Sequence, residues 1–427
     1  MMTADDRPAS PPAALPAVHE SWLPREHALH RPRHAERQTV ALVCAAVFFA
    51  APALSFALGA RPTEFENRSL TPFPSPGDGW SFFTDLAPWA TDHLVLREQA
   101  VHAADAVSRG VFGEPAPFGN NHHEANPIES PPSRPRELHY PTVLEGKDGW
   151  LYLGEEIASH CEQDQPLAQT VAQLRRLRDG VEATGRKFVV VIAPDKATLV
   201  PEHLPERYVG KDCHRRAVDE FWRTMSAQDY VIDLRDELAA WGTQLGEPVY
   251  GPQDAHWSDE GGVLMARTVA EKLRPGISAS WAVTPGEAWR VPADLPPLMG
   301  RSGETIGRHY AVAPDGVSDQ TRDVGHDYRK PLKLNTASGP GTYGLGVGLL
   351  GDSFTIRALP YLSAAFGNMT VLHHDSVVGK GGATVAGDLL ARSDVVVLQI
   401  AERTLARGGP AILRPDVING VLARLSR

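Results

Sequence analysis

The sequence predicts an α/β protein built around an open, mostly parallel β-sheet. From residue 149 onward, runs of aliphatic residues alternate with helical segments, which is the βαβ rhythm of such sheets. The clearest run, Lys187–Pro194, is continuous and β-branched, as expected of a strand covered on both faces. Between Pro285 and Tyr343 the rhythm lapses into a polar segment containing glycine and proline, which we expect to form loops and a hairpin over the sheet edge.

Local patterns predict the other elements. Gly149–Gly154 is expected to form a short strand or hairpin, and Asp229–Leu238 a second strand. Three more strands are expected near 346–354, 369–375 and 394–403. Apolar residues spaced by three and four predict a helix through Leu167, Val171, Leu174, Leu177 and Val181. Ser258 is expected to cap a second helix, whose apolar face carries Val263, Ala266, Ala270 and Leu273.

Composition limits the classes of function. The chain has 427 residues, with 42 Lys and Arg against 52 Asp and Glu, and its formal net charge of −10 argues against a general nucleic-acid binder. With 42% hydrophobic and 22% charged residues, the composition is that of a globular protein with a sizeable core. We expect no cofactor, and the glycine-rich turn at 379–382 lacks the spacing of a phosphate-binding loop.

The first 140 residues are expected to be appendages. Residues 1–38 contain several prolines and no apolar periodicity, and we expect a disordered cytoplasmic tail. Residues 39–60 carry no charge and are long enough to cross a hydrocarbon core of about 30 Å. We expect an uncleaved transmembrane anchor there, with a cleaved signal peptide or a buried helix as the alternatives. Residues 61–113 are expected to be a membrane-proximal helical segment, and 114–140 a proline-rich linker.

The distribution of arginines predicts the orientation of this anchor. More arginines precede the apolar segment than follow it closely, which favours a cytoplasmic N-terminus: Arg25, Arg31, Arg33 and Arg37 precede it, and Arg61 and Arg68 follow it. The main domain, 141–427 with its insertion at about 285–343, is then expected on the extracytoplasmic side of the membrane. Outside the cytoplasm Cys161 and Cys213 could form a disulfide, and two free buried thiols are the alternative.

Residues that follow the predicted strands suggest the chemistry. Ligands of open α/β sheets lie beyond the carboxyl ends of the strands, and Gly351-Asp352-Ser353 stands where a strand gives way to a helix. A serine hydroxyl needs a neutral imidazole to accept its proton, and that imidazole needs an anion to fix its tautomer. Asp254 and His256 can supply both groups from one loop, although a turn-capping aspartate and an ordinary polar histidine are the alternative.

The order of the motifs resembles a known family. The strand at APDK, the strand at VIDL and the loop at DAHW resemble the C-terminal half of SGNH hydrolases, but Ser353 follows that loop instead of preceding it. This rearranged order resembles the AlgX/AlgJ-type alginate O-acetyltransferase family. The further matching stretches are Glu66–Arg68, Asp92–Arg97, Asp148–Gly154, Ala193–Pro205, Ala293–Gly300 and Glu402-Arg403.

The resemblance implies an activity and its residues. It implies an SGNH-hydrolase-like (flavodoxin-like) domain that moves acetyl groups onto hydroxyls of an exported polysaccharide, outside the cytoplasmic membrane. The triad would be Asp254, His256 and Ser353. A multi-pass membrane O-acyltransferase would be the partner that carries the acetyl group across the membrane. An extracytoplasmic carbohydrate acetylesterase with the same triad is one alternative, and a non-catalytic glycan-binding scaffold of an export complex is another.

Supporting roles are expected for a few other residues. The N–H of Ser353 is one candidate oxyanion donor, and a second could come from the turn containing Gly381 or from the loop after Gln399. Lys196, Trp257 and Arg403 are candidate contacts to the substrate. We expect no metal site, because adjacent side chains of a strand point to opposite faces and His373, His374 and Asp375 should not ligate one ion together.

Overall fold

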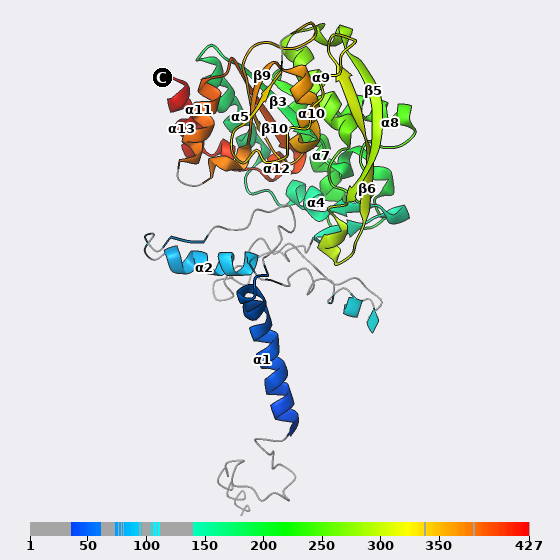
Figure 1. Cartoon of the computed structure of the whole chain (residues 1–427), viewed down its shortest axis with the longest axis vertical. Coiled ribbons are helices and arrows are strands. Elements are labelled where there is room, and N and C mark those ends of the chain that lie inside the picture. Colours follow the sequence, from blue (N-terminus) through cyan, green and yellow to red (C-terminus); the bar gives the residue numbers. More distant parts are fainter. Residues whose placement is uncertain are drawn as a thin grey trace, which may run out of the picture. The chain divides into compact units, whose positions relative to one another are not determined.

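The computed structural model describes residues 36–60, a discontinuous set of positions between 73 and 111, and residues 140–426 except 337, 338, 379 and 380. The predicted linker at 114–140, apart from its last residue, and most of the predicted tail at 1–38 lie outside these residues. The chain forms two compact units, Met1–Glu64 with Ser69–Arg97, and Phe65–Arg68 with Glu98–Arg427 (Figure 1). Each unit is described by itself.

The first unit contains two helices, α1 (Glu36–Ala57) and α2 (Ser81–Asp92). Phe73 packs edge-to-face against Trp89 of α2, with ring centroids 5.0 Å apart. Within the described residues, no helix combines the length and the apolar character that crossing a membrane requires. Helix α1 covers residues 39–57 of the stretch over which the transmembrane anchor is predicted.

A six-stranded sheet organises the second unit, in the order β4-β3-β10-β8-β9-β7. Neighbouring strands run parallel except the edge strand β7, which pairs antiparallel with β9. The predicted mostly parallel sheet is thus confirmed as a mixed sheet. Its strands are β3 (Lys187–Ala193), β4 (Val231–Asp233), β7 (Leu332–Asn335), β8 (Val347–Gly351), β9 (Asn368–His373) and β10 (Val395–Ala401).

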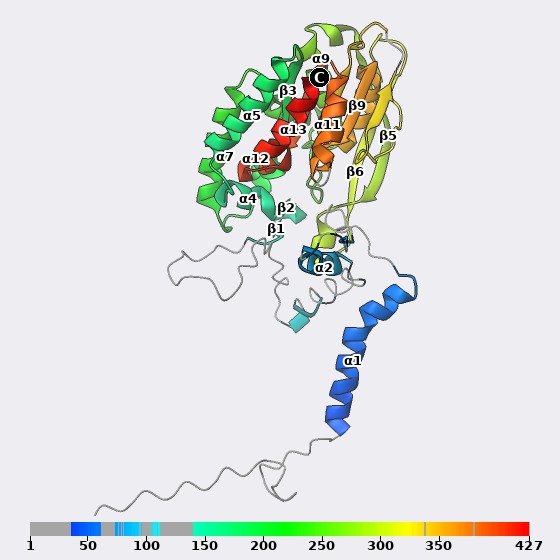
Figure 2. The ribbon, with the colours of Figure 1, turned by 90° about the vertical axis from the view of Figure 1, so that its left-hand side faces the viewer.

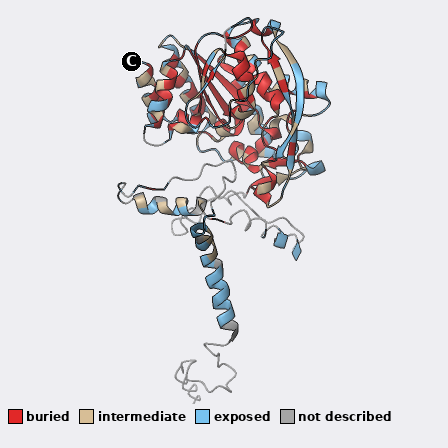
Figure 3. Cartoon of the chain, in the orientation of Figure 1, coloured by how far each residue is buried: buried red, intermediate tan, exposed pale blue. Residues whose placement is uncertain are grey.

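Helices cover both faces of this sheet (Figure 2), and the buried residues lie between the layers (Figure 3). One face is covered by α8 (Arg235–Leu245), α9 (Asp259–Leu273) and α10 (Thr355–Ala365). The other is covered by α5 (Leu167–Glu182), α7 (Lys211–Ser226), α11 (Gly382–Ala391), α12 (Glu402–Arg407) and α13 (Pro415–Leu425).

Strand β3 shows why the aliphatic run forms a two-sided strand. Phe188, Val190 and Ile192 pack into the core beneath α5 and α7. Val189, Val191 and Ala193 alternate with them and pack into the core beneath α8 and α9. Because successive side chains of a strand point to opposite faces, only a continuous apolar run can fill both layers.

Smaller elements complete the unit. The predicted hairpin near Gly149–Gly154 is confirmed as β1 (Val143–Glu145) paired antiparallel with β2 (Leu151–Leu153). A long hairpin of β5 (Ala282–Pro292) and β6 (Glu304–Ala313) lies in the predicted insertion. The remaining short helices are η3 (Lys147–Gly149), α4 (Gly154–Cys161), α6 (Lys196–Leu199), η4 (Pro201–His203), η5 (Ile277–Ser280), η6 (Pro296–Met299), η7 (His374–Val377) and η8 (Ala411–Leu413).

Three sequence expectations need correction. The strand predicted at Asp229–Leu238 ends at Asp233, whose carboxylate accepts the backbone N–H of Arg235 and so starts α8. The insertion is not confined to loops and a hairpin, because β7 within it joins the main sheet. Ser258 is the N-cap of α9, but its hydroxyl donates to the carbonyl of Val249 and contacts Glu260 instead of bonding a helix N–H.

A disulfide joins Cys161 at the end of α4 to Cys213 near the start of α7; their Cα atoms are 5.8 Å apart, and the sequence separation is 52. The sequence analysis leaves a disulfide and two free thiols as alternatives, and the structure contains the disulfide. Closing a loop of this length stabilises the fold by about 4 kcal/mol in the chain-entropy model. The bond thereby fixes α4 against α7, close to the carboxyl edge of the sheet.

Candidate active site

The turn that carries Ser353 connects the buried strand β8 to α10. Asp352 holds this turn: its carboxylate accepts the backbone N–H of Phe354 at 3.0 Å and that of Ala401 at 2.6 Å. Its own N–H donates to the side chain of Gln399 at 2.9 Å. Asp352 therefore ties the turn to the neighbouring strand β10 and leaves Ser353 at the carboxyl edge of the sheet.

The loop before α9 carries Asp254 and His256 and is fastened to this turn. The indole N–H of Trp257 donates to the carbonyl of Phe354 at 3.0 Å, and the two rings meet edge-to-face. Trp257 is only 1% exposed. Its predicted contact with substrate is therefore corrected, because the side chain is occupied in joining the two segments.

The structure brings together the three residues of the predicted triad. Nε2 of His256 lies 2.8 Å from Oγ of Ser353, and Nδ1 lies 3.1 Å from a carboxylate oxygen of Asp254. The same Asp254 oxygen accepts the backbone N–H of His256 at 3.0 Å, which fixes the carboxylate beside the ring. This arrangement can accept the Ser353 proton at one ring nitrogen while holding the other nitrogen as the donor.

A second carboxylate, which the sequence analysis did not assign, contacts the same imidazole. An oxygen of Asp294, from the segment after β5, lies 3.0 Å from Nδ1 of His256. Its other oxygen accepts the backbone N–H of Ala255 at 2.9 Å. The conspicuous Ala293–Gly300 stretch was the available signal, but nothing in it indicated a partner for His256. We call Asp254, His256, Asp294 and Ser353 the serine cluster.

Two carboxylates change the proton affinity of His256. Burial lowers the pKa of this imidazole, but hydrogen bonds and charge from Asp254 and Asp294 outweigh burial and raise the pKa to about 9. Burial raises the pKa of Asp254, but the hydrogen bonds and the charge of His256 outweigh burial and lower that pKa below its usual value. The serine cluster therefore favours an imidazolium between carboxylates, the state that forms when His256 takes a proton from Ser353.

Lys196 lies beneath the histidine loop and not beside a substrate. The side chain is fully buried, and its ammonium donates to the carbonyls of Gly251, Pro252 and Asp254 at 3.1, 3.2 and 2.7 Å. Burial lowers the pKa of Lys196 to about 8. The predicted substrate contact is corrected: Lys196 positions the loop, because all three of its N–H donors serve the loop backbone.

Arg403 is also part of the framework. Its guanidinium donates to Asp195 at 2.8 Å, and Asp195 is fully buried. Burial raises the pKa of Asp195 well above its usual value despite this partner. Arg403 thus forms an ion pair with a buried carboxylate, and its contact with substrate stays a prediction.

These two cations belong to a larger group of ionisable side chains. Glu402 accepts the backbone N–H of Asp195 at 2.8 Å, the hydroxyl of Thr198 at 2.8 Å and a ring nitrogen of His160 at 3.1 Å. We call Glu156, His160, Asp195, Lys196, Glu402 and Arg403 the buried cluster. Each of its members is at most 9% exposed.

The oxyanion site is partly defined. Ser353 lies two positions before the first residue of α10, next to the N-cap Phe354, and its backbone N–H has no hydrogen-bond acceptor among the described residues. That N–H at a positive helix end is suited to an oxyanion. Gly381 is exposed at the start of α11 with φ 85°, and no contact joins it to the serine cluster in the part of the chain that is described. Its role as a second donor stays a prediction.

Three groups of side chains have the ligand atoms for a metal ion within 4.8 Å of one another. They are His373 with His374 and Asp375, His160 with Asp195 and Glu402, and Asp254 with His256 and Asp294. The sequence analysis expects His373, His374 and Asp375 to point to opposite faces of a strand, and this expectation is wrong. Strand β9 ends at His373 and the chain continues as η7, so the three side chains do not alternate. In that turn Nδ1 of His373 already accepts the backbone N–H of Asp375, and His374 lies 3.0 Å from the Asp375 carboxylate.

Comparisons with known proteins agree on one family. The profile of the family described as "SGNH hydrolase-like domain, acetyltransferase AlgX" matches residues 143–366. Two proteins named "Probable alginate O-acetylase AlgJ" are similar: that of Pseudomonas fluorescens is 32% identical over 31% of this chain, and that of Pseudomonas aeruginosa 31% identical over 31%. The matched stretches span about a third of those relatives, 34% and 32% of their lengths.

Solved structures are similar at lower identity. The O-acetyltransferase domain of Pseudomonas putida AlgJ is 18% identical, with 67% of this chain and 99% of that chain covered and a TM-score of 0.41. Bacillus cereus PatB1 is 14% identical, with 64% and 98% covered and a TM-score of 0.42.

Proposed function

Because the chain belongs to the family of AlgX-type acetyltransferases with an SGNH hydrolase-like domain, we propose that it transfers acetyl groups through an acyl-serine onto hydroxyls of an exported or cell-surface polysaccharide. The observation that carries the proposal is the hydrogen-bonded line from Ser353 through His256 to Asp254. The proteins named alginate O-acetylases among its relatives support the same reaction class.

The proposed reaction has two steps. His256 accepts the hydroxyl proton of Ser353, whose Oγ attacks the acetyl carbonyl carbon of the donor. The tetrahedral intermediate collapses, the donor's leaving group departs with the proton from His256, and the acetyl group remains as an ester on Oγ. In the second step His256 takes the proton of a sugar hydroxyl, the sugar oxygen attacks the ester, and the proton returns to Ser353.

The carboxylates contribute electrostatically to both steps. Each step forms an imidazolium at His256, and Asp254 and Asp294 lie 3.1 and 3.0 Å from its Nδ1. The N–H of Ser353, in the turn just before α10, is the donor available to the oxyanion that develops in each intermediate. The chain's own residues can thus supply the nucleophile, the base and part of the oxyanion site.

Location and partner are further parts of the proposal. The Cys161–Cys213 bond favours an extracytoplasmic domain, because structural disulfides persist in oxidising compartments. This can be tested on protein isolated from cells and alkylated either before or after reduction. If the two cysteines are bonded in the cell, mass spectrometry should find them alkylated only after reduction. The acetyl donor would come from a multi-pass membrane O-acyltransferase, and attachment through residues 39–60 stays a prediction.

Mass spectrometry of the full chain tests the proposal. The protein is given p-nitrophenyl acetate and a panel of oligosaccharides, beside Ser353→Ala and the control Ser426→Ala, which removes an exposed hydroxyl at the end of α13. We expect acetylated sugar with the wild type and the control, and none with Ser353→Ala. Release of acetate that depends on Ser353, with unmodified sugars, would favour the acetylesterase alternative. No turnover of p-nitrophenyl acetate, with or without an oligosaccharide, would favour the glycan-binding scaffold.

A further inference from the structure

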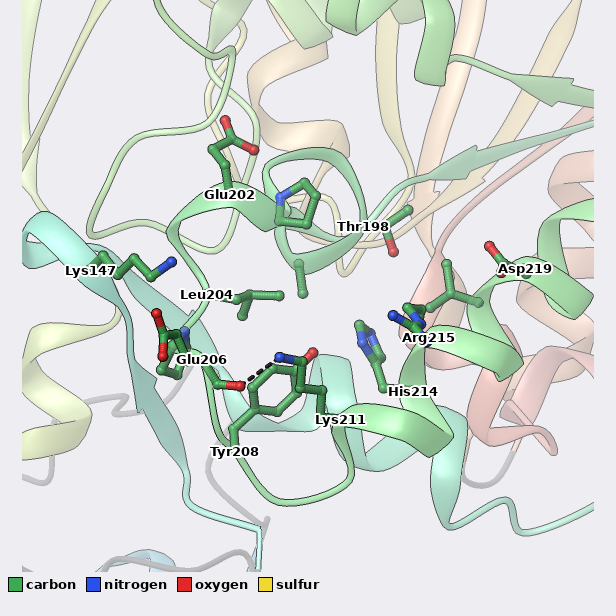
Figure 4. Close-up of a pocket in the computed structure, with 14 residues that line it drawn as sticks. Lys147, Thr198, Glu202, Leu204, Glu206, Tyr208, Lys211, His214, Arg215 and Asp219 are labelled. Carbon is green, nitrogen blue, oxygen red and sulfur yellow. Dashed lines mark hydrogen bonds between the residues drawn. The ribbon is translucent and has the colours of Figure 1, made fainter.

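A pocket lies at the carboxyl edge of the sheet, on the side of β3 (Figure 4). It has a volume of about 510 Å³, within the size range of small-molecule sites. Its walls come from the segment 197–208 after β3, from the first half of α7 and from Lys147 in the β1–β2 hairpin. None of the residues assigned to the serine cluster lines it.

The rim of this pocket carries equal numbers of cations and anions. Lys147, Lys211 and Arg215 are donors only, whereas Glu202, Glu206 and Asp219 are acceptors only. All six are exposed, and the signs are mixed around the opening: Figure 4 draws Glu206 on the side of Lys147 and Asp219 on the side of Arg215. The net charge of the rim is therefore zero, and its cations and anions are not segregated into a patch that would attract an ion.

The interior of the pocket combines apolar walls with two polar groups, and one of them, the hydroxyl of Thr198, donates its proton to Glu402 and can still accept from a ligand. The apolar walls include Leu204 and the ring of Tyr208. Thr198 and His214 provide the polar groups, and burial together with His160 lowers the pKa of His214 to about 4, so its imidazole is neutral. Nε2 of His214 is buried without a hydrogen-bond partner among the described residues.

These features fit a neutral polyhydroxylated ligand. A hydroxyl group both donates and accepts, so a sugar can pair with donor-only and acceptor-only rim groups at once. Its C–H faces can pack against Leu204 and Tyr208, as apolar walls of binding sites require. An anionic ligand would meet three carboxylates at the rim, and a cationic ligand three cations, at comparable cost.

The pocket is placed along the same edge as Ser353. Its wall begins just after β3, while Ser353 follows β8, and only β10 separates these two strands. Two strand spacings correspond to about 10 Å. The four residues of α6 link the two regions, because Lys196 binds the histidine loop while Thr198 lines the pocket.

We propose that this pocket binds an uncharged sugar unit of the acceptor polysaccharide and so holds the chain at a distance from Ser353. The inference rests on the proposed function for its choice of acceptor. It assigns a second glycan-binding site to the domain itself, separate from the serine cluster. Longer acceptors should therefore benefit from the pocket, and short ones should not.

Binding measurements on the full chain test this inference. The probes are the neutral hexasaccharides cellohexaose, maltohexaose and chitohexaose, with hexagalacturonate as the anionic comparison, measured by calorimetry. The variant Arg215→Ala/Asp219→Ala removes one cation and one anion of the rim without changing net charge. Its control is Arg216→Ala/Glu220→Ala, which makes the same changes at the next positions of α7, outside the pocket lining.

We expect at least one neutral hexasaccharide to bind at least tenfold more weakly to the rim variant than to the wild type or the control. Ser353-dependent hydrolysis of p-nitrophenyl acetate should be the same in all three proteins. Equal binding by all three, no binding of any neutral probe, or binding of hexagalacturonate alone would overturn the inference. Loss of the Ser353-dependent hydrolysis from the wild type would instead contradict the proposed function, whatever the pocket binds.

Discussion

The serine cluster and the buried cluster lie at the same edge of the sheet, and both contain carboxylates and a histidine. Each joins carboxylates to a histidine: Asp254 and Asp294 to His256 in one, Glu402 to His160 in the other. In the buried cluster the Glu402 carboxylate already accepts three hydrogen bonds from the protein. In the serine cluster the second ring nitrogen of His256 meets the hydroxyl of Ser353.

Accessibility separates the two clusters. The side chains of Asp254, His256 and Asp294 are 12%, 14% and 27% exposed, whereas those of His160, Asp195 and Glu402 are 1%, 0% and 0%. Arg403 is the exception in the buried cluster, with 11% of its side chain exposed. The histidine and the carboxylates of the buried cluster therefore meet only protein groups, and their charges act on the fold. The comparison teaches that residue type does not separate a reactive site from a framework here. What separates them is whether a hydrogen-bonding position remains open to a substrate.

The largest effect is expected on stability when the buried cluster loses a charge. Arg403→Met leaves the fully buried Asp195 without its ion-pair partner. Breaking a buried pair from one side costs about 3–5 kcal/mol in the free energy of unfolding. Urea denaturation followed by circular dichroism measures that loss.

Arg414→Met is the matched control for Arg403→Met. Arg414 pairs with Asp416 at 3.0 Å, but the two side chains are 56% and 65% exposed. Exposed pairs contribute about 0–1 kcal/mol, so this variant should be close to the wild type. A similar small loss for both variants would contradict the view that the buried cluster stabilises the fold.

A smaller effect, on the pH dependence of activity, is expected from Asp294→Asn. This change removes one of the two carboxylates that raise the pKa of His256 to about 9 and leaves Asp254 as the acceptor for Nδ1. The imidazole then loses its proton at a lower pH, and the rising limb of the rate profile should move to lower pH. The plateau rate should fall by roughly tenfold, about 1.4 kcal/mol, because one carboxylate no longer stabilises the imidazolium. Acetate release from p-nitrophenyl acetate between pH 5 and 10 measures both.

Protein stability gives an independent measurement of the same shift. The pKa of His256 in the folded protein, about 9, lies above its unfolded value of about 6.5. His256 therefore contributes stability that is complete below pH 6.5 and is lost as the pH rises toward 9. Asp294→Asn should lose less stability across this window than the wild type. An unchanged rate profile together with an unchanged stability profile would remove Asp294 from the serine cluster.

The sequence predicted the parts of the site that depend on local patterns. Ser353 follows a strand, and Asp254 and His256 share one loop, so their proximity in space follows from the parallel sheet. Asp294 could not be assigned, because it lies in the insertion, where no periodicity indicates what the chain contacts. The role of Lys196 could not be predicted, because a charge after a strand looks the same in sequence whether or not other segments cover it. The strand at Lys187–Pro194 was predictable because burial on both faces requires a continuous apolar run.

The smallest effect is expected from Arg357→Gln, which tests how far the electrostatics of the serine cluster extend. Arg357 lies one turn after Ser353 on α10, and its guanidinium stacks 3.9 Å from the ring centroid of Trp289. Its charge contributes to lowering the pKa of Asp254, but less than burial and the bonds to His256 affect that pKa. Removing it should raise the pKa of Asp254 slightly, but that carboxylate titrates far below the rising limb that His256 sets. The rate profile should therefore keep its position, and the plateau rate should change by less than about threefold. The rate of p-nitrophenyl acetate hydrolysis at neutral pH measures this. A fall of that rate by thirtyfold or more would show that Arg357 acts directly on the reacting groups. The serine cluster would then have to include a cation, as the buried cluster does.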